Sequence, residues 1–355
     1  MESTLSADAS PVEASVPAAP GVVVAVIVDQ PTMVLEEVFG ALGAQDYSNT
    51  QVLVLLTGSD ADELEVVRQI VQSTVPTAHI RQLGADVGFG VAANTALRLV
   101  EGDSGFFLIM HDDVVMAPDA LRILVEELYR SNAGMVGPKF VEWDDSRRLQ
   151  AVGFDCDWFG ELDSAVEPHE LDQEQHDAVR DVFVLSSACV LVRADLFREL
   201  DGFEASIEFF GEDLDLCWRA HLSGARVVVV PAATARHRAS IVERLASRRS
   251  DSATLMRRAE RHRMATVVSL TGRRRLPIVL PSLVVLTFVQ VLGEIVRGRW
   301  QRASAGLSGL FGLLTNIGAI ARRRSRVRQL RRVPDHEVVE LQVRGSVRWK
   351  RMIRN

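Results

Sequence analysis

The stretch Val22-Val23-Val24-Ala25-Val26-Ile27-Val28-Asp29 decides the fold. Its first seven residues are apolar and mostly β-branched, which is typical of a strand buried on both faces. Similar runs alternate with helical patterns along the chain. We expect strands at 22–28, 52–56, 78–83, 106–110, 182–192 and 226–230, and helices at 31–42, 60–75, 87–100, from 118 onward and through 218–222. This alternation predicts an α/β fold with a mostly parallel central sheet and flanking helices.

The composition along the chain predicts four segments. Residues 1–20 are rich in Ala, Ser and Pro and carry no Lys or Arg, which predicts a disordered tail rather than a secretory signal peptide. Residues 21–240 form the α/β domain, with an irregular acidic insertion at 141–181. Residues 241–332 are a basic, apolar helical region that we expect to associate with a membrane. Residues 333–355 are polar and would fit a chain that is truncated there.

The charge is divided unevenly between the two parts of the chain. Residues 236–355 hold 27 Lys and Arg against 7 Asp and Glu, whereas residues 1–235 hold 13 against 40. An acidic front part argues against nucleic acid there, and a basic rear part favours an anionic partner. The rear part has few interleaved aromatic residues, so nucleic acid ranks behind an anionic membrane surface.

Two uncharged stretches support the membrane interpretation. Residues 276–293 and 303–320 are 18 residues each, near the lower limit for a spanning helix. Arginine triplets at 273–275 and 322–324 flank them, and in a helical hairpin both would lie on the cytoplasmic side. The second stretch is amphipathic, which also suits a helix on the membrane surface or packed on a neighbour. A buried helical subdomain is the alternative, and the same helices could support an oligomer.

The three cysteines, Cys156, Cys189 and Cys217, are odd in number and far apart. The absence of a Cys-x-x-Cys spacing argues against a zinc site or a disulfide framework. We expect all three to be small buried hydrophobic residues.

The most specific motif is Phe209-Phe-Gly-Glu-Asp-Leu-Asp-Leu-Cys-Trp-Arg219. Its carboxylates Glu212, Asp213 and Asp215 lie within four positions in an apolar setting, where neighbouring carboxylates push their pKa values apart. One of them could accept a proton from an attacking hydroxyl group. The alternative is a charged helix start favoured by the helix dipole, but this leaves the flanking aromatic residues unexplained.

Further polar groups follow the expected strands at the edge where such sheets bind ligands. His111-Asp112-Asp113 follows one strand, and paired carboxylates there suit Mg²⁺ or Mn²⁺. The segment 83–94 is a glycine-rich turn into a helix, which favours anions. His237 follows the last strand and could complete a metal site with Asp113. Each motif alone also fits an ordinary helix cap, turn or structural histidine.

In this order and spacing, the motifs resemble the inverting family 2 glycosyltransferases with a GT-A fold, especially the bacterial rhamnosyl- and galactofuranosyltransferase types. The resemblance covers about residues 22–237. It implies that Asp213 is the general base and that Asp113 and His237 bind Mg²⁺ or Mn²⁺ on the donor diphosphate. It implies acceptor contacts by Glu212, Trp218 and Arg219. On the donor side it implies contacts by Asp29, Gly58, Asp86, Gly88, Asn94 and Asp112.

The sequence departs from the family pattern on the nucleotide side. Leu56-Thr57 precedes Gly58-Ser59, where the family usually has an acidic residue that contacts the base, and Ile27-Val28 precedes Asp29, where it usually has a Thr and an aromatic residue or His. We therefore expect a metal-dependent inverting enzyme that uses a nucleotide sugar and a lipid-linked or cell-wall acceptor at the cytoplasmic face of the plasma membrane. The alternative is a non-catalytic glycan- or nucleotide-binding module with a degenerate site.

Overall fold

The computed structural model describes residues 19–29, 31–58, 60–84, 87–100, 105–239 and 252–354. The predicted disordered tail lies almost entirely outside these residues. The strands are β1 Val22–Val28, β2 Thr50–Leu56, β3 His79–Gln82, β4 Phe106–His111, β5 Val114–Met116, β6 Met135–Glu142, β7 Leu149–Ala151, β8 Asp155–Cys156, β9 Leu162–Asp163, β10 Arg180–Asp181, β11 Cys189–Arg193 and β12 Val227–His237. The helices are α1 Leu35–Gly43, α2 Ala61–Thr74, α3 Phe89–Leu99, α4 Ala120–Arg130, α5 Ala194–Glu199, α6 Glu212–Leu222, α8 Ser252–Leu270, α9 Leu276–Val296, α10 Trp300–Thr315, α11 Ile317–Leu330, α12 Asp335–Glu340 and α13 Val347–Arg354.

The predicted mostly parallel sheet is confirmed. Its order is β10-β12-β6-β11-β4-β1-β2-β3, with β5 on β12 and β7 on β6. β1 runs parallel to both β2 and β4, and β12 runs parallel to β6. β11 is antiparallel to β4 and β6. The carboxyl ends of β1, β2, β4, β6 and β12 therefore meet at one edge of the sheet, where ligands bind in such folds.

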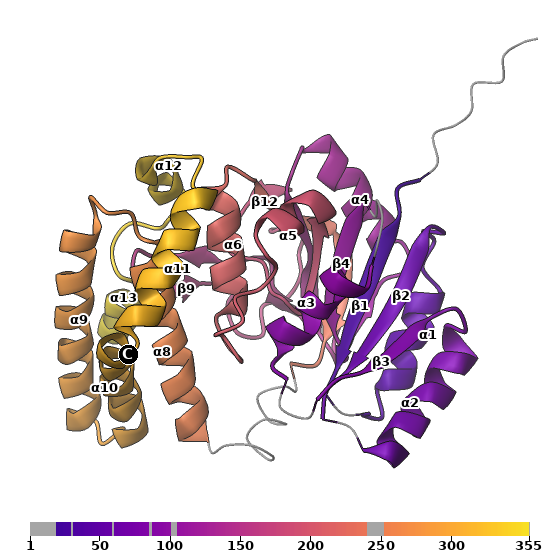
Figure 1. Ribbon diagram of the computed structural model, residues 1–355, viewed down its shortest axis with the longest axis horizontal. Coiled ribbons are helices and arrows are strands. Elements are labelled where there is room, and N and C mark those ends of the chain that lie inside the picture. The colour runs from indigo at the N-terminus through magenta and orange to yellow at the C-terminus, as the bar shows by residue number, and fades with distance from the viewer. Residues whose placement is uncertain are drawn as a thin grey trace, which may run out of the picture.

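The uninterrupted apolar run of β1 is explained by helices on both faces of the sheet (Figure 1). Val23, Ala25 and Ile27 belong to one apolar core together with residues of α3, α5 and α6. The other residues of the strand belong to a second core with residues of α1, α2 and α4: Val22, Val24, Val26 and Val28. Successive side chains of a strand point to opposite faces, so both sets must be apolar.

β6, β11 and β12 differ from the prediction, and the short strands β5 and β7 to β10 were not predicted either. β6 was not expected, because Pro138 and Lys139 interrupt its apolar pattern and a proline argues against an inner strand. Lys139 is buried there and pairs with Asp172 at 2.7 Å and Asp177 at 2.8 Å, both in the acidic insertion. β12 continues past Pro231, where the register with β6 shifts between Val230 and Thr234. β11 is shorter than expected and starts only at Cys189.

The C-terminal helices pack against the α/β part (Figure 1). Residues of α8, α9 and α11 join the same apolar core as α6. The first uncharged stretch forms α9, which among the described helices has the length and hydropathy of a membrane span, with 22% of its apolar window buried. The second is broken, because α10 and α11 meet at 76°. The polar segment after residue 332 forms α12 and α13.

Candidate active site

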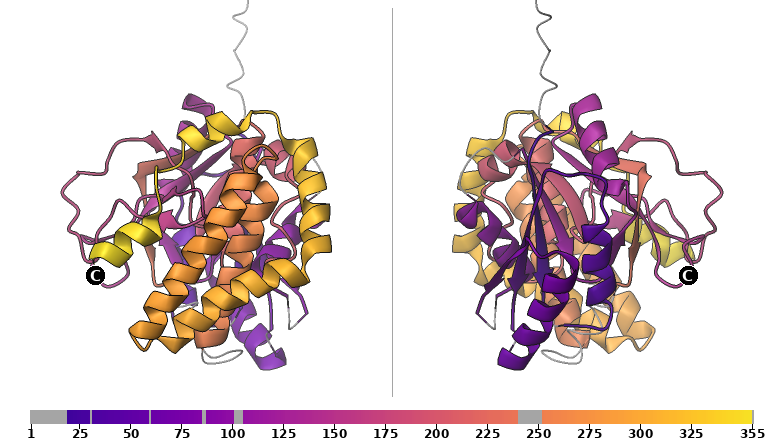
Figure 2. Two further views of the ribbon diagram at one scale, coloured as in Figure 1. Left: turned by 90° about the vertical axis from the view of Figure 1, so that its left-hand side faces the viewer. Right: turned by 90° about the vertical axis from the view of Figure 1, so that its right-hand side faces the viewer.

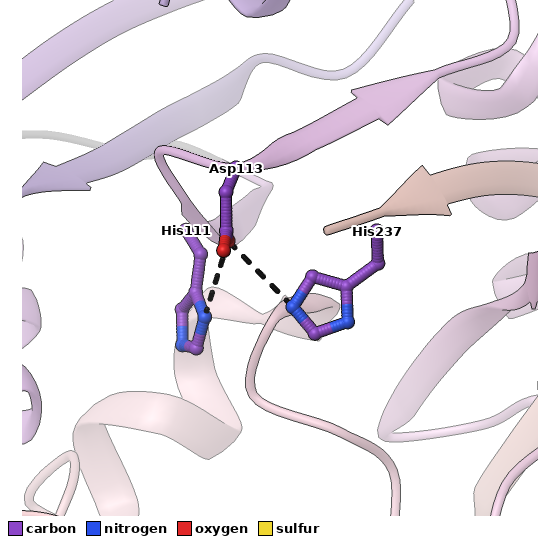
Figure 3. Close-up of side chains that lie close together, drawn as sticks. All are labelled: His111, Asp113 and His237. Carbon is purple, nitrogen blue, oxygen red and sulfur yellow. Dashed lines mark ion pairs between the residues drawn. The ribbon is translucent and has the colours of Figure 1, made fainter. Parts of the chain in front are cut away.

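Three potential metal ligands meet at the carboxyl edge of the sheet (Figure 3). His111 ends β4, Asp113 lies in the turn to β5, and His237 ends β12. The Asp113 Oδ1 atom is 3.8 Å from His111 Nδ1 and 3.6 Å from His237 Nε2. One ligand atom from each residue lies within 4.8 Å of the others. The sequence indicated Asp113 and His237 but not His111, although its position at the strand end directly before the Asp pair could have indicated it.

Gln150 of β7 holds His237 in place. Its amide nitrogen donates to the His237 carbonyl at 2.9 Å, and its amide oxygen lies 2.8 Å from His237 Nδ1. The first bond fixes which amide atom is oxygen, so Nδ1 is the protonated ring nitrogen. The lone pair of the ring is then on Nε2, which faces Asp113. Such an outer partner is the usual companion of a metal-binding histidine.

The donor set of this cluster fits a divalent cation. Asp113 is fully buried and His111 is 8% exposed, so the groups converge in a site largely removed from bulk water. A carboxylate suits Mg²⁺ and Mn²⁺, and two imidazoles shift the preference toward a transition metal. The residues fit Mn²⁺ better than Mg²⁺.

Asp29 and Asp112, two of the predicted donor contacts, come together at the ends of β1 and β4. The Asp29 amide donates to Asp112 Oδ2 at 3.3 Å, and the Thr57 hydroxyl donates to Asp29 Oδ1 at 3.3 Å. Thr57, at the position where the family usually has an acid, is thus linked to Asp29. Gly58 follows with φ of +74°, a conformation that favours glycine. Asp86, another predicted donor contact, lies outside the described residues.

Asn94 and Gly88 support the wall of the site. The Asn94 side chain donates to the Phe203 carbonyl and accepts from the Phe203 amide, both at 2.8 Å. A Cβ on Gly88 would lie 2.6 Å from the Glu208 carbonyl oxygen, so this close backbone approach requires glycine. The Asn94 amide is therefore engaged in fastening α3 to the turn at Phe203, rather than directed at a ligand.

Glu212 and Asp213 begin α6 after an unusual turn. Phe210 and Gly211 have φ of +62° and +96°, and the His262 Nδ1 atom of α8 lies 2.9 Å from the Phe209 carbonyl oxygen. The Ser187 hydroxyl donates to Glu212 Oε1 at 3.4 Å, and Glu212 Oε2 is buried without a hydrogen-bond partner among the described residues.

Burial shapes the acidity of this pair. It raises the pKa of Asp213, despite a 2.7 Å hydrogen bond from the Leu214 amide. Burial also raises the pKa of Glu212, and the neighbouring Asp213 charge raises it further. Raised carboxylate pKa values are characteristic of groups that accept or donate protons near neutral pH.

A short loop connects the carboxylate pair with the ligand cluster. The His111 amide donates to the Ala188 carbonyl at 3.0 Å, and the adjacent Ser187 bonds Glu212. Phe89 also packs edge-on against His111, with ring centroids 4.6 Å apart. The start of α6 is therefore linked to the end of β4 through Ser187 and Ala188.

Trp218 and Arg219, predicted as acceptor contacts, point into the core instead. Trp218 is 4% exposed and packs edge-on against Phe183 at 5.5 Å. Arg219 pairs with Asp215 at 2.6 Å and donates to the Leu200 carbonyl. Burial raises the pKa of Asp215, but the charges of Arg219 and Arg323 outweigh it and the pKa lies below its ordinary value. Asp215 thus has a structural role, and all three cysteines are buried as expected.

Comparison with known proteins identifies the family of the chain. Residues 18–265 match the model of the family "Glycosyltransferase like family 2", and the chain therefore belongs to this family. An N-acetylglucosaminyl-diphospho-decaprenol L-rhamnosyltransferase of Mycobacterium tuberculosis is 28% identical over 181 residues, 46% of this chain and 59% of the relative. A pre-mycofactocin glycosyltransferase of the same species is 27% identical over 154 residues, 42% of this chain and 30% of the relative. The matches thus span less than two thirds of each relative.

The fold has a counterpart among solved structures. A structure of GalNAc-T7 with UDP, GalNAc and Mn²⁺ aligns with a TM-score of 0.53 and 10% identity, over 70% of this chain and 51% of the other. At that identity the likeness concerns the fold alone. The expected GT-A type of α/β fold is confirmed.

Proposed function

We propose that this chain is a metal-dependent, inverting glycosyltransferase that moves a sugar from a nucleotide donor to a lipid-linked or cell-wall glycan acceptor. The observation that carries the proposal is the joining of the Glu212–Asp213 pair to the His111–Asp113–His237 cluster through the loop at Ser187 and Ala188. Family membership supports the sugar chemistry.

Asp213 is the general base of the proposed reaction. Its raised pKa makes it a stronger proton acceptor than an ordinary aspartate. It removes the proton from the acceptor hydroxyl as the oxygen attacks the anomeric carbon. The bond from that carbon to the donor diphosphate breaks in the same step, the electron pair leaves with the diphosphate, and the configuration inverts. Glu212, with one oxygen on Ser187 and the other without a hydrogen-bond partner among the described residues, orients the acceptor.

His111, Asp113 and His237 would hold the cation, and Gln150 would orient His237. The chemistry that a bound Mn²⁺ or Mg²⁺ supplies is neutralisation of the charge on the leaving diphosphate. Asp29, Asp112 and Gly58 line the side where the donor nucleotide would lie. The Thr57 hydroxyl donates a hydrogen bond to Asp29. This link favours Asp29 as the residue that contacts the nucleobase of the donor, in place of the acidic residue that the family usually has at the position of Thr57.

The acceptor class and location rest on two further observations. The rhamnosyltransferase relative is named for a substrate linked to decaprenol through a diphosphate. α9 is long and apolar, and the C-terminal helices are rich in arginine. Both observations favour a lipid-linked acceptor and a location of the enzyme at the cytoplasmic face of the plasma membrane.

The decisive variant is Asp213→Asn, with nucleotide-sugar hydrolysis and transfer as readouts. The amide preserves shape and the bond from the Leu214 amide but cannot take the proton, so turnover should fall by about 10²–10⁴-fold. Calorimetry with UDP and Mn²⁺ should give unchanged donor binding. Near-normal turnover in Asp213→Asn would refute the assignment of Asp213 as the general base. If the wild type binds none of a panel of nucleotides, a non-catalytic module would be favoured.

A further inference from the structure

The outer face of the C-terminal helices exposes two rows of large apolar side chains. On α9 they are Ile278, Val285, Phe288, Val289, Leu292 and Val296, and on α10 they are Trp300, Leu307, Phe311 and Leu314. The two helices lie next to each other on the face turned to the viewer in the left view of Figure 2. Several of these residues are more than half exposed, among them Leu314 at 69% and Val296 at 87%. A contiguous apolar face of this kind marks an interaction site.

This face contains a groove that is almost entirely apolar. The groove has a volume of about 550 Å³ and lies between α9, α10 and α11. Leu280, Val284, Phe288, Leu310, Leu314 and Ile317 line it, and Arg324 is its one charged lining residue among the described parts of the chain. The lining has the chemistry of a site for hydrocarbon.

A strongly basic cavity lies at the Arg324 end of the groove. It measures about 760 Å³ and is lined by six arginines, at 273, 274, 275, 324, 328 and 331, and by two carboxylates, Asp335 and Glu340. Asp335 pairs with Arg331. Burial lowers the pKa of Arg324, and the charges of Arg331 and Arg273 lower it further. Cations crowded in this way are stabilised by an anion.

We propose that the groove and the cavity together form a binding site for one anionic phospholipid of the bilayer, with its acyl chains in the groove and its phosphate among the arginines. Arg324 lines both spaces, so the apolar groove and the cationic cavity adjoin at this residue. A lipid with a phosphate next to its acyl chains matches this order of charge and hydrocarbon. The proposal deepens the membrane setting of the proposed function and does not concern the reacting groups.

The site also sets the orientation of the helices. α9 packs along its length on α10 and, through Val279 and Leu283, on the apolar core that includes α6. A helix that packs in this way against the α/β domain cannot cross a bilayer in the same conformation. α9 and α10 therefore lie in the plane of the membrane surface, with their exposed apolar faces toward the bilayer.

The basic cavity lies close to the active-site turn along α8. His262 of α8 contacts the turn before Glu212, whereas Thr271, nine residues further along the chain, lines the basic cavity. The lipid is thus about 13 Å along α8 from the active-site turn.

Two paired variants of the full chain test the site. Arg273→Gln with Arg328→Gln removes two exposed cations of the cavity, and Phe288→Ser with Leu314→Ser makes the groove polar. Matched controls at exposed positions outside the C-terminal helices are Arg68→Gln with Arg81→Gln and Val66→Ser with Leu99→Ser. Binding is measured by co-sedimentation with vesicles of phosphatidylcholine containing phosphatidylglycerol, and with phosphatidylcholine alone.

The wild type and both controls should bind the anionic vesicles and bind the neutral ones weakly. The arginine pair should lose about 25-fold in partitioning, about fivefold per arginine, and the serine pair should lose at least as much. Native mass spectrometry from detergent should retain one phosphatidylglycerol per chain in the wild type and none in either variant. The proposal is overturned if the wild type does not bind anionic vesicles, or if the variants bind them like their controls. It is also overturned if the apolar face instead joins two copies of the chain in a dimer that the serine pair converts to monomers. UDP binding should be unchanged in all variants, so its absence from the wild type would count against the proposed function and not against the lipid site.

Discussion

Gln150 and His237 are joined by two hydrogen bonds, one from the Gln150 amide nitrogen to the His237 carbonyl and one between the amide oxygen and His237 Nδ1. Together they fix the tautomer and the ring orientation of His237. Gln150→Leu keeps the volume but removes both bonds. We expect Mn²⁺ affinity to fall by about 10- to 100-fold, measured by calorimetry without substrate. Gln69→Leu, on an exposed face of α2, is the control, and unchanged Mn²⁺ affinity in Gln150→Leu would contradict the positioning role.

The ligand cluster predicts a preference for Mn²⁺ over Mg²⁺, because two of its three groups are imidazoles. His111→Ala should lower Mn²⁺ affinity by more than tenfold and Mg²⁺ affinity much less, measured by the electron paramagnetic resonance of free Mn²⁺ and by Mg²⁺ competition. His79→Ala, at an exposed position of β3, serves as the control. Equal losses for the two ions, or none, would remove His111 from the ligand set.

The sequence could predict most of the sheet, because strands buried on both faces are continuous apolar runs that no other element explains. β1 was predicted to the residue. β6 was missed because its buried Lys139 depends on Asp172 and Asp177, more than 30 residues away. The candidate site was predictable where carboxylates follow strands, as at Asp112 and Asp113.

Other site features depend on contacts that no local pattern encodes. Gln150 gave no signal, because a lone glutamine in an irregular insertion has no preferred role. Trp218 and Arg219 were misplaced because helical periodicity gives the spacing of side chains but not which face the core covers. Here the core side carries Trp218 on Phe183 and Arg219 on Asp215.

The raised pKa values of Glu212 and Asp213 predict a sign for the pH dependence of stability. The folded chain retains protons on these groups that the unfolded chain has released, so the free energy of unfolding falls as pH rises from the ordinary carboxylate range through the raised pKa values. Glu212→Gln removes one such group. Its free energy of unfolding, measured with urea from about pH 5 to about pH 8, should fall less steeply than that of the wild type. Glu65→Gln, exposed on α2, should leave the slope unchanged, and a steeper slope in Glu212→Gln would contradict the assignment.

Asp213 and Asp215 are two residues apart, but substitution by asparagine should separate their roles completely. Asp215 is fully buried between Arg219 of α6 and Arg323 of α11, and it ties the C-terminal helices to the active-site helix. Asp215→Asn removes the carboxylate charge that Arg219 and Arg323 share and leaves Arg323 with its longer, 3.7 Å pair to Glu204, which should cost about 3–5 kcal/mol in the free energy of unfolding. Asp213→Asn should not lower the stability at neutral pH, because it removes a carboxylate whose pKa burial raises, while turnover falls by about 10²–10⁴-fold. Hydrogen exchange should also show earlier opening of α11 in Asp215→Asn, because Arg323 loses the closer of its two carboxylate partners. If Asp215→Asn unfolds at the same urea concentration as the wild type, the pair does not hold the two parts together.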